Sequence, residues 1–339
     1  MDPVTQGVLG ATLAQATADH RRLRACAIAG LAGGLAPDLD IFIRSATDPL
    51  LYLEFHRQFT HALVFIPIGA GLCALLLQPF LHRHLSWRDT YLSCLLGYAT
   101  HGLLDACTSY GTQLFWPMST LRVSWNWISV VDPLFTLPLL ILLGIGLLRR
   151  RPMFAKAGLI WAALYMCIGF AQHERAVAAA ERLAHTRGHQ IERLNVKPGF
   201  ANLLLWKAVY RHDGRYYVAG LRIAADTSHC GGADIEALDT DRALPWLVPD
   251  SQQARDLERF RWYSDGWLAL DPEEPLYIVD VRYSSLPNTI DALWGLKLDT
   301  EAGPDRHATY HVVQSRRTEA MDKLLDLLRG SACRNLPPA

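Results

Sequence analysis

Residues 62–81 read ALVFIPIGAGLCALLLQPFL, a run of twenty residues without a charged side chain. A helix of about 20 apolar residues is long enough to cross the hydrocarbon core of a bilayer. The run therefore predicts a membrane helix. Its N-terminal flank is unusual for a lipid-facing segment, because His56, Arg57 and His61 stand directly before it.

Further apolar segments surround this run and predict an α-helical polytopic membrane domain over residues 1–172. Several of them are shorter than a clean span requires, which favours helices packed among other helices. We therefore expect four to six membrane helices. The additional segments are residues 5–18, 26–43, 91–108, 133–148 and 157–171.

Residues 173–339 hold about two thirds of the charged side chains and predict a soluble α+β domain. Residues 201–212 and 215–224 alternate in polarity and are joined by Asp213-Gly214, a hairpin signal. We expect further strands at 276–283, 293–298 and 307–314, and helices at 254–262 and 317–329.

The overall composition excludes some classes of protein. The formal net charge is zero, so a nucleic-acid partner is not expected. None of the seven cysteines forms a C-x-x-C pair, which argues against a thiolate zinc site. The chain also lacks a G-x-x-x-x-G-K-[ST] nucleotide-binding loop.

Four short motifs place ionisable groups within or beside the apolar segments. Charged and imidazole groups at membrane depth are costly, so they usually face a protein interior or a wet cavity. Aspartate and histidine together are also common ligands of divalent metals. The motifs supply Asp38 and Asp40, then His56, Arg57 and His61, then His101 and Asp105, and finally Asp132.

The spacing within these motifs indicates a metal site but leaves alternatives open. His101 and Asp105 are four residues apart, so they share one face of a helix. They can supply two ligands, or only a hydrogen-bonded pair that stabilises the interior. Asp38 and Asp40 repel each other unless a cation lies between them, and the alternative is a solvated turn.

The other two motifs are less decisive. His56 and His61 are five apart, which does not place both on one helix face. Arg57 can clamp a phosphate or a carboxylate beside a metal, or it can simply reach toward the membrane interface. Asp132 precedes Pro133, so it is either a further site residue or a helix N-cap.

The loop charges predict a topology. Basic residues gather in the loops at 20–24, 82–88 and 149–156, which the positive-inside rule places in the cytoplasm. All four motifs then converge on the outer membrane face, and the C-terminal domain lies on that side. An extracytoplasmic location would allow Cys230 and Cys333 to form a disulfide.

Several motifs in a fixed order resemble the YdjM family of bacterial inner-membrane proteins, described as metal-dependent hydrolases. The resemblance covers residues 1 to about 172. It rests on MDPVTQG at the N-terminus, PDLD at 37–40, HRQFTH at 56–61, HGLLDACTSYGTQLFWP at 101–117 and Asp132-Pro133. Many members carry a histidine where this chain has Gln6. The family is distantly similar to zinc-dependent phospholipase C and single-strand nucleases, which implies phosphoester hydrolysis.

The leading hypothesis is a multi-pass hydrolase of the inner membrane that uses one or two divalent ions, with zinc preferred over manganese or magnesium. The expected metal ligands are Asp38, Asp40, His56, His61, His101 and Asp105. Arg57, Asp105 and Asp132 are the expected catalytic residues, and a membrane lipid or lipid-linked phosphoester is the expected substrate. An ion-translocating transporter and a non-catalytic scaffold are the alternatives.

Overall fold

The computed structural model describes residues 1–313 and 317–336, and the chain divides into two compact units. Unit 1 comprises Met1–Ile43, Phe55–Ala171 and Phe200–Asn202. Unit 2 comprises Arg44–Glu54, Gln172–Gly199 and Leu203–Ala339. Residues 44–54 therefore belong to the C-terminal unit although the chain reaches them early.

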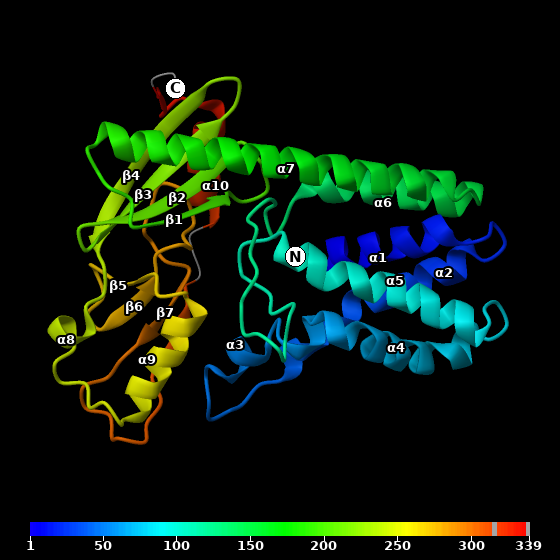
Figure 1. Cartoon of the computed structure of the whole chain (residues 1–339), viewed down its shortest axis with the longest axis horizontal. Helices are drawn as coiled ribbons and strands as arrows, with labels where there is room; N and C mark the ends of the chain where they lie inside the picture. Colours follow the sequence, from blue (N-terminus) through cyan, green and yellow to red (C-terminus); the bar gives the residue numbers. More distant parts are fainter. Residues whose placement is uncertain (314–316, 337–339) are drawn as a thin grey trace. The chain divides into compact units, whose positions relative to one another are not determined.

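Unit 1 is helical (Figure 1). Its α-helices are α1 (Pro3–Thr17), α2 (Leu23–Leu35), α4 (Ile66–Leu81), α5 (Trp87–Ala106), α6 (Pro133–Arg149) and the first part of α7 (Met153–Thr186). Short 3-10 helices are η1 (Ala36–Phe42), η2 (Phe59–His61) and η3 (Leu63–Phe65).

Three segments are long and apolar enough to cross a membrane: Leu23–Phe42, Leu63–Leu81 and Met153–Thr186. Helix α6 is apolar but has only 17 residues. The expectation of a helical N-terminal region with membrane spans is thus confirmed. The count of four to six spans stays a prediction.

Glycines allow α1, α2 and α5 to approach closely. A Cβ atom on Gly97 of α5 would lie 2.0 Å from the carbonyl oxygen of Gly30 in α2. A Cβ on Gly10 of α1 would lie 2.5 Å from the same oxygen. Small residues let helix backbones touch in this way, which suits packing among membrane helices. This three-helix contact fixes α5 against the end of α2.

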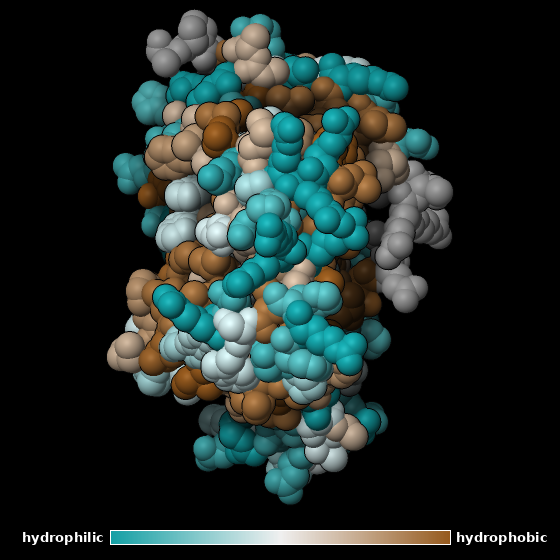
Figure 2. All heavy atoms as spheres, turned by 90° about the vertical axis from the view of Figure 1, so that its right-hand side faces the viewer, coloured by the Kyte–Doolittle hydropathy of each residue, from teal (hydrophilic) through white to brown (hydrophobic). Residues whose placement is uncertain are grey.

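The basic turns of unit 1 lie at one end of its helices. The α1–α2, α4–α5 and α6–α7 turns share the right-hand end in Figure 1. Figure 2 shows hydrophilic side chains running through the middle of that face, bordered by hydrophobic ones. The exposed basic residues of these turns are Arg21, Arg22, Arg24, Arg83, Arg88, Arg149, Arg150, Arg151 and Lys156. Helix α5 begins at this end, so its last turn points to the opposite one.

Unit 2 contains two antiparallel sheets. The first has the order β1-β2-β3-β4-β9, with β1 (Arg193–Pro198), β2 (Leu205–His212), β3 (Arg215–Ile223), β4 (Thr227–Glu236) and β9 (Arg334–Asn335). The second has the order β5-β6-β7-β8, with β5 (Leu268–Leu270), β6 (Tyr277–Asp280), β7 (Trp294–Lys297) and β8 (Thr309–Val312).

Helices complete the unit, and both sheets contribute to its core. The helices are α3 (Leu51–Phe55), which ends at the border of unit 1, α8 (Thr240–Ala243), α9 (Gln252–Tyr263), α10 (Arg317–Arg329) and the second part of α7. Val209 and Val218 of the first sheet belong to one buried cluster with Val279 of the second. The expected sheet-containing C-terminal domain is therefore confirmed.

The hairpin and three later strands lie where the sequence predicts them. Asp213 and Gly214 adopt positive φ angles of 47° and 70°, as a tight hairpin turn requires. Position 314, at the end of one expected strand, lies outside the described residues. Strands β1, β4, β5 and β9 were not predicted, and Cys230 of β4 forms the expected disulfide with Cys333.

Candidate metal centre

Three segments of unit 1 supply the clustered side chains. Pro37 stands near the start of η1, where the chain tightens from α-helix to 3-10 helix and presents Asp38 and Asp40. His61 is the last residue of η2. His101 and Asp105 lie one turn apart near the end of α5. The predicted common face of His101 and Asp105 is therefore present.

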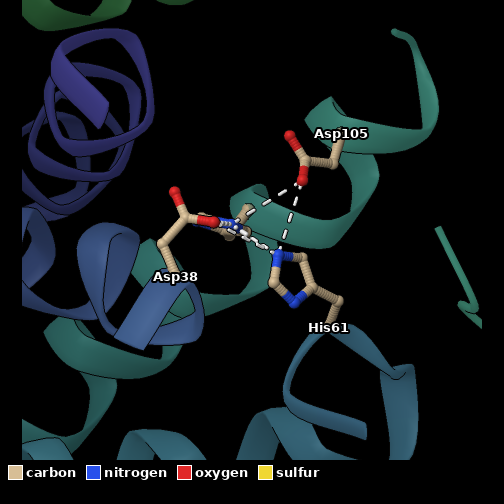
Figure 3. A group of neighbouring side chains, drawn as sticks. Asp38, His61 and Asp105 are labelled. Atoms are coloured by element: carbon tan, nitrogen blue, oxygen red, sulfur yellow. Dashed lines mark hydrogen bonds and ion pairs between the residues drawn. The ribbon is translucent and has the colours of Figure 1, made fainter. Parts of the chain in front are cut away.

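Four ligand atoms converge on one point. The Nε2 atoms of His61 and His101 are 3.0 Å apart. Asp38 Oδ1 lies 3.5 Å from the His61 nitrogen and 3.3 Å from the His101 nitrogen. Asp105 Oδ2 lies 3.4 Å and 3.9 Å from the same two atoms. In Figure 3 the His61 ring and the two carboxylates turn toward one another.

The surrounding hydrogen bonds fix the tautomers of both histidines. His101 Nδ1 lies 2.6 Å from the Gly34 carbonyl oxygen, which can only accept, so this nitrogen carries the proton. Thr60 donates its hydroxyl proton to Asp40, so it accepts a hydrogen bond from His61 Nδ1. When both rings are neutral, the two Nε2 atoms therefore present lone pairs to each other, which is unfavourable unless a proton or a metal ion lies between them.

Burial increases the energetic cost of leaving these facing polar atoms without a partner. The side chains of His61, His101 and Asp105 are fully buried, and that of Asp38 is 19% exposed. Burial by itself lowers the pKa of His61, but hydrogen bonds to the three surrounding carboxylates raise it to about 10. The three carboxylates around His61 therefore favour a positive charge at this position. Either a proton on His61 or a bound divalent ion can supply that charge.

Asp40 lies behind the cluster and holds its neighbours in place. Its Oδ2 accepts hydrogen bonds from the Arg57 backbone N–H (3.0 Å) and the Thr60 hydroxyl (2.8 Å). The same oxygen is 3.3 Å from His61 Nδ1, and its Oδ1 is 2.7 Å from His56 Nδ1. A carboxylate behind a ligating histidine orients the ring and raises its basicity.

Asp38, Asp40 and His56 form a second group whose ligand atoms lie within 4.8 Å of one another. Asp38 belongs to both groups. A shared carboxylate is the feature that allows two neighbouring ions to be bridged. All six predicted ligands are thus brought together, divided between two overlapping groups.

Arg57 contacts Asp105 rather than standing apart from the cluster. Its Nε lies 3.1 Å from Asp105 Oδ2, and Nη1 donates to the Thr108 hydroxyl at 3.2 Å. The residue has a φ of 65°, which is strained for a side chain other than glycine. Its backbone is held in this conformation by Asp40 and by Gln113, whose N–H donates to the Arg57 carbonyl. Such strain is typical of functional sites.

The N-terminal residues have supporting roles. Gln6 donates from Nε2 to Asp105 Oδ1 at 2.8 Å, and the amino nitrogen of Met1 contacts the same oxygen. Asp2 caps α1 by accepting a hydrogen bond from the Thr5 N–H.

Asp132 lies outside both groups. It caps α6, where its Oδ1 accepts from the backbone N–H groups of Leu134 and Phe135. Both of its oxygens also accept from the Tyr165 hydroxyl at 2.9 Å. Asp132 is therefore the N-cap of α6, one of the two roles that the sequence allows. A catalytic role for Asp132 stays a prediction.

Two further residues position the site and were not singled out in the sequence. Tyr98 donates its hydroxyl to the Thr60 carbonyl at 2.9 Å. A Cβ on Gly102 would lie 2.5 Å from the His61 carbonyl oxygen. Both lie on α5 near His101. Tyr98 is three residues before His101 and seven before Asp105, and this same-face helical spacing is the signal that marks it.

A family model described as YdjM inner membrane protein matches residues 1–176. The chain belongs to the YdjM family. The match covers every residue of the candidate metal centre, and it ends within α7. No curated protein and no solved structure matches the chain. The resemblance inferred from the motifs is confirmed, and this YdjM protein is a membrane protein.

Proposed function

We propose that this YdjM protein is a metal-dependent hydrolase of the bacterial inner membrane that cleaves a phosphoester in a lipid or lipid-linked substrate. One observation carries the proposal: two imidazole Nε2 atoms and two carboxylate oxygens converge, with separations of 3.0–3.9 Å between the two nitrogens and between each nitrogen and each oxygen. Ligands about 2.0 Å from a tetrahedral zinc ion are about 3.3 Å apart. The donor set therefore fits a zinc ion.

The burial of the ligands indicates where a substrate would enter. His61, His101 and Asp105 are fully buried and form a three-residue set of the kind that catalytic zinc sites use. Asp38 is the one partly exposed member, so the cluster opens on its side. A bound divalent ion would supply a water of lowered pKa and polarise the scissile group.

The chain's own residues would prepare this chemistry. Asp40 holds His61 and His56 in orientation through the contacts described above. Arg57 balances the charge of Asp105, and we assign it the stabilisation of negative charge that develops on the substrate. Asp38, Asp40 and His56 would hold a second ion, and their two carboxylates would also suit manganese or magnesium.

An apolar groove beside Asp38 supports a lipid substrate. The groove has a volume of about 330 Å³ and contains Leu39, the neighbour of Asp38. We expect an acyl chain to lie along this groove while the headgroup approaches Asp38. The groove is lined by Leu31, Ala32, Leu35, Ala36, Leu39, Cys73, Leu76 and Leu77.

We further propose a multi-pass topology with the site on the extracytoplasmic side. The basic turns of unit 1 gather at the opposite end of α5 from His101 and Asp105, which agrees with the positive-inside rule. The Cys230–Cys333 disulfide supports an oxidising location for the C-terminal domain.

The test uses the full-length protein purified in detergent. We expect about one or two zinc, manganese or magnesium ions per chain by elemental analysis, and turnover of at least one lipid phosphoester in a substrate panel. His101→Ala should abolish both, whereas His20→Ala, which alters a surface histidine paired with Asp19, should change neither.

Other outcomes would contradict the proposal in different ways. Protein without bound metal that is indifferent to His101→Ala would exclude a metal enzyme. Bound metal without turnover across the panel would favour the scaffold. Ion flux in proteoliposomes that depends on His101 would favour the transporter.

A further inference from the structure

A segment between two ligand motifs is held by the C-terminal unit. Residues 44–54, here called the strap, connect Asp40 to His56 along the chain. By its contacts the strap belongs to unit 2, whereas Ile43 and Phe55 on either side belong to unit 1. The two ends of the strap are therefore covalently tied to the candidate metal centre.

Arg259 of α9 makes the polar contacts to the strap. Its Nη1 and Nη2 donate to the two carboxylate oxygens of Asp48 at 3.0 Å and 2.8 Å. Its Nε donates to Glu54 at 2.5 Å. The contact with Asp48 is bidentate, and the carboxylate of Glu54 binds the Nε atom of the same guanidinium. Such a contact fixes the orientation of the two side chains as well as the distance between them.

Arg259 is itself held in place. Nη1 also donates to Asp256 at 3.0 Å, one turn earlier on α9. Asp256 is fully buried and accepts a hydrogen bond from the Ala308 N–H at 3.0 Å, and His307 Nδ1 lies 2.9 Å from it. The guanidinium is thus oriented by a buried acid anchored to the segment before β8.

Apolar contacts secure the same segment. Leu50 and Leu53 of the strap are 1% and 4% exposed. They line one small pocket with Phe260 and Trp262, which follow Arg259 on α9. Asp48 also accepts a hydrogen bond from the Leu50 N–H at 3.0 Å, so the turn that carries Asp48 is fixed locally.

We infer that Arg259 is a positioning residue for the metal centre: by fixing the strap, it sets the path of the chain between Asp40 and His56. Glu54 is two residues before His56, so a shift of the strap displaces the segment that carries His56, Arg57 and His61. The sheet-containing unit would then act on the site through this tether. The expected effect of Arg259 on metal binding rests on the proposed function. The expected effect of Arg259 on the conformation of the strap does not.

The test compares full-length Arg259→Met with two other proteins in detergent. Arg259→Lys keeps the charge but loses the bidentate contact. Arg261→Met is the matched control, because Arg261 lies on the same helix and contacts Glu258 and Thr240 instead of the strap. Formation of the Cys230–Cys333 disulfide verifies folding of unit 2 in each variant.

Hydrogen–deuterium exchange gives the first readout. We expect exchange of peptides covering residues 44–61 to accelerate at least tenfold in Arg259→Met, less in Arg259→Lys, and not at all in Arg261→Met. Unchanged exchange in Arg259→Met would overturn the inference. If Arg259→Met fails to fold, Asp48→Asn makes the same comparison from the strap side.

Cobalt binding gives the second readout, which loss of stability alone would not change. Co²⁺ bound to the wild-type protein should give visible absorption bands typical of a tetrahedral site. We expect Arg259→Met to alter these bands and to weaken metal affinity about tenfold, with partial recovery in Arg259→Lys. Wild-type bands and affinity in Arg259→Met would contradict the inference. Absence of metal from the wild-type protein would overturn the proposed function, and exchange would then decide the role of the strap.

Discussion

At the residue scale, the contacts of Asp40 distinguish a metal ligand from a residue that orients a ligand, two roles that the sequence does not distinguish. Asp40 accepts two hydrogen bonds through Oδ2 and faces the rings of His56 and His61. Toward the ion that His61 and His101 would hold, these contacts make Asp40 an orienting residue behind His61 and not a ligand. Proximity along the chain to Asp38 gave no indication of this division.

Asp40→Asn should therefore weaken zinc affinity by about 10- to 100-fold, because a ligating histidine loses its carboxylate partner. Competition with a chelator measures the affinity. Asp89→Asn, at the opposite end of α5 and paired with Arg22, is the control and should bind as the wild type does. An unchanged affinity in Asp40→Asn would contradict the assignment. A loss far beyond 100-fold would make Asp40 a direct ligand.

Lys207 is a buried lysine of unit 2. It lies on β2 directly opposite Lys197 of β1, and it is 2% exposed. Its ammonium donates to the Ser284 hydroxyl at 2.5 Å and to the Thr289 carbonyl at 2.7 Å. Burial lowers its pKa to about 7. The charged form is therefore destabilised in the folded protein.

This pKa shift predicts a pH dependence of stability with a definite sign. Between pH 7 and about 10 the unfolded chain keeps a proton on Lys207 that the folded chain has lost. The free energy of unfolding should then rise with pH across this window, by at most about 1.4 kcal/mol per pH unit. Below pH 7 both states are protonated and the contribution is constant.

Urea unfolding of the full-length protein at several pH values tests this slope. Lys207→Met should reduce the rise between pH 7 and 10, and the opposite Lys197, whose pKa burial also lowers, should keep the remainder. Lys297→Met, which removes a surface lysine paired with Glu274, should keep it. Identical pH slopes for Lys207→Met and the wild type would show that burial does not deprotonate this lysine.

At the element scale, the sequence predicts the helices of the site better than the details of their ends. The four-residue spacing of His101 and Asp105 is sufficient to place both on one face of α5. The five-residue spacing of His56 and His61 is not, because the chain passes through the 3-10 helix η2 and only His61 reaches the first group.

Strand β4 shows why part of the fold escapes sequence patterns. It contains Gly231 and Gly232, which disfavour a strand locally. A Cβ on Gly232 would lie 2.0 Å from the Val218 carbonyl oxygen of β3, so the neighbouring strand requires glycine there. Tertiary contact, rather than local preference, decides this element.

Close packing of α2 and α5 gives the element-scale prediction. In Gly97→Ala the added methyl group meets the Gly30 carbonyl at 2.0 Å, and neither backbone can move without separating the helices. Overpacking of this kind costs about 1–3 kcal/mol. We expect a lower thermal transition in detergent and weaker zinc retention, because α5 carries two ligands.

Gly144→Ala is the matched control, because a Cβ at this position of α6 meets nothing within 4 Å. It should leave the transition unchanged or raise it slightly, since alanine favours a helix. A transition in Gly97→Ala equal to that of Gly144→Ala would mean that α2 and α5 are not packed this closely.

At the scale of the whole molecule, the strap links the membrane side of the site to the membrane side of the C-terminal domain. Residues 44–54 lie between two ligand motifs but pack within unit 2. Under the proposed topology we therefore expect the site's loop and the sheets on the same side of the membrane. The loop charges predict this shared side, but local sequence patterns contain no sign of the contact itself, because it joins residues about 200 positions apart, such as Asp48 and Arg259.

The disulfide makes the side of the membrane measurable. Five cysteines are free in the structure, and Cys230 and Cys333 are joined. When protein is trapped directly from cells with a thiol reagent in denaturant, the reagent should label five cysteines before reduction and all seven after it.

In the control variant Cys333→Ser, the reagent should label six cysteines in both conditions. This variant should also lose about 4–5 kcal/mol of stability, because the bond closes a loop of 103 residues. Seven reactive thiols before reduction would place the sheets in a reducing compartment. Through the strap, that result would move the metal centre to the cytoplasmic face.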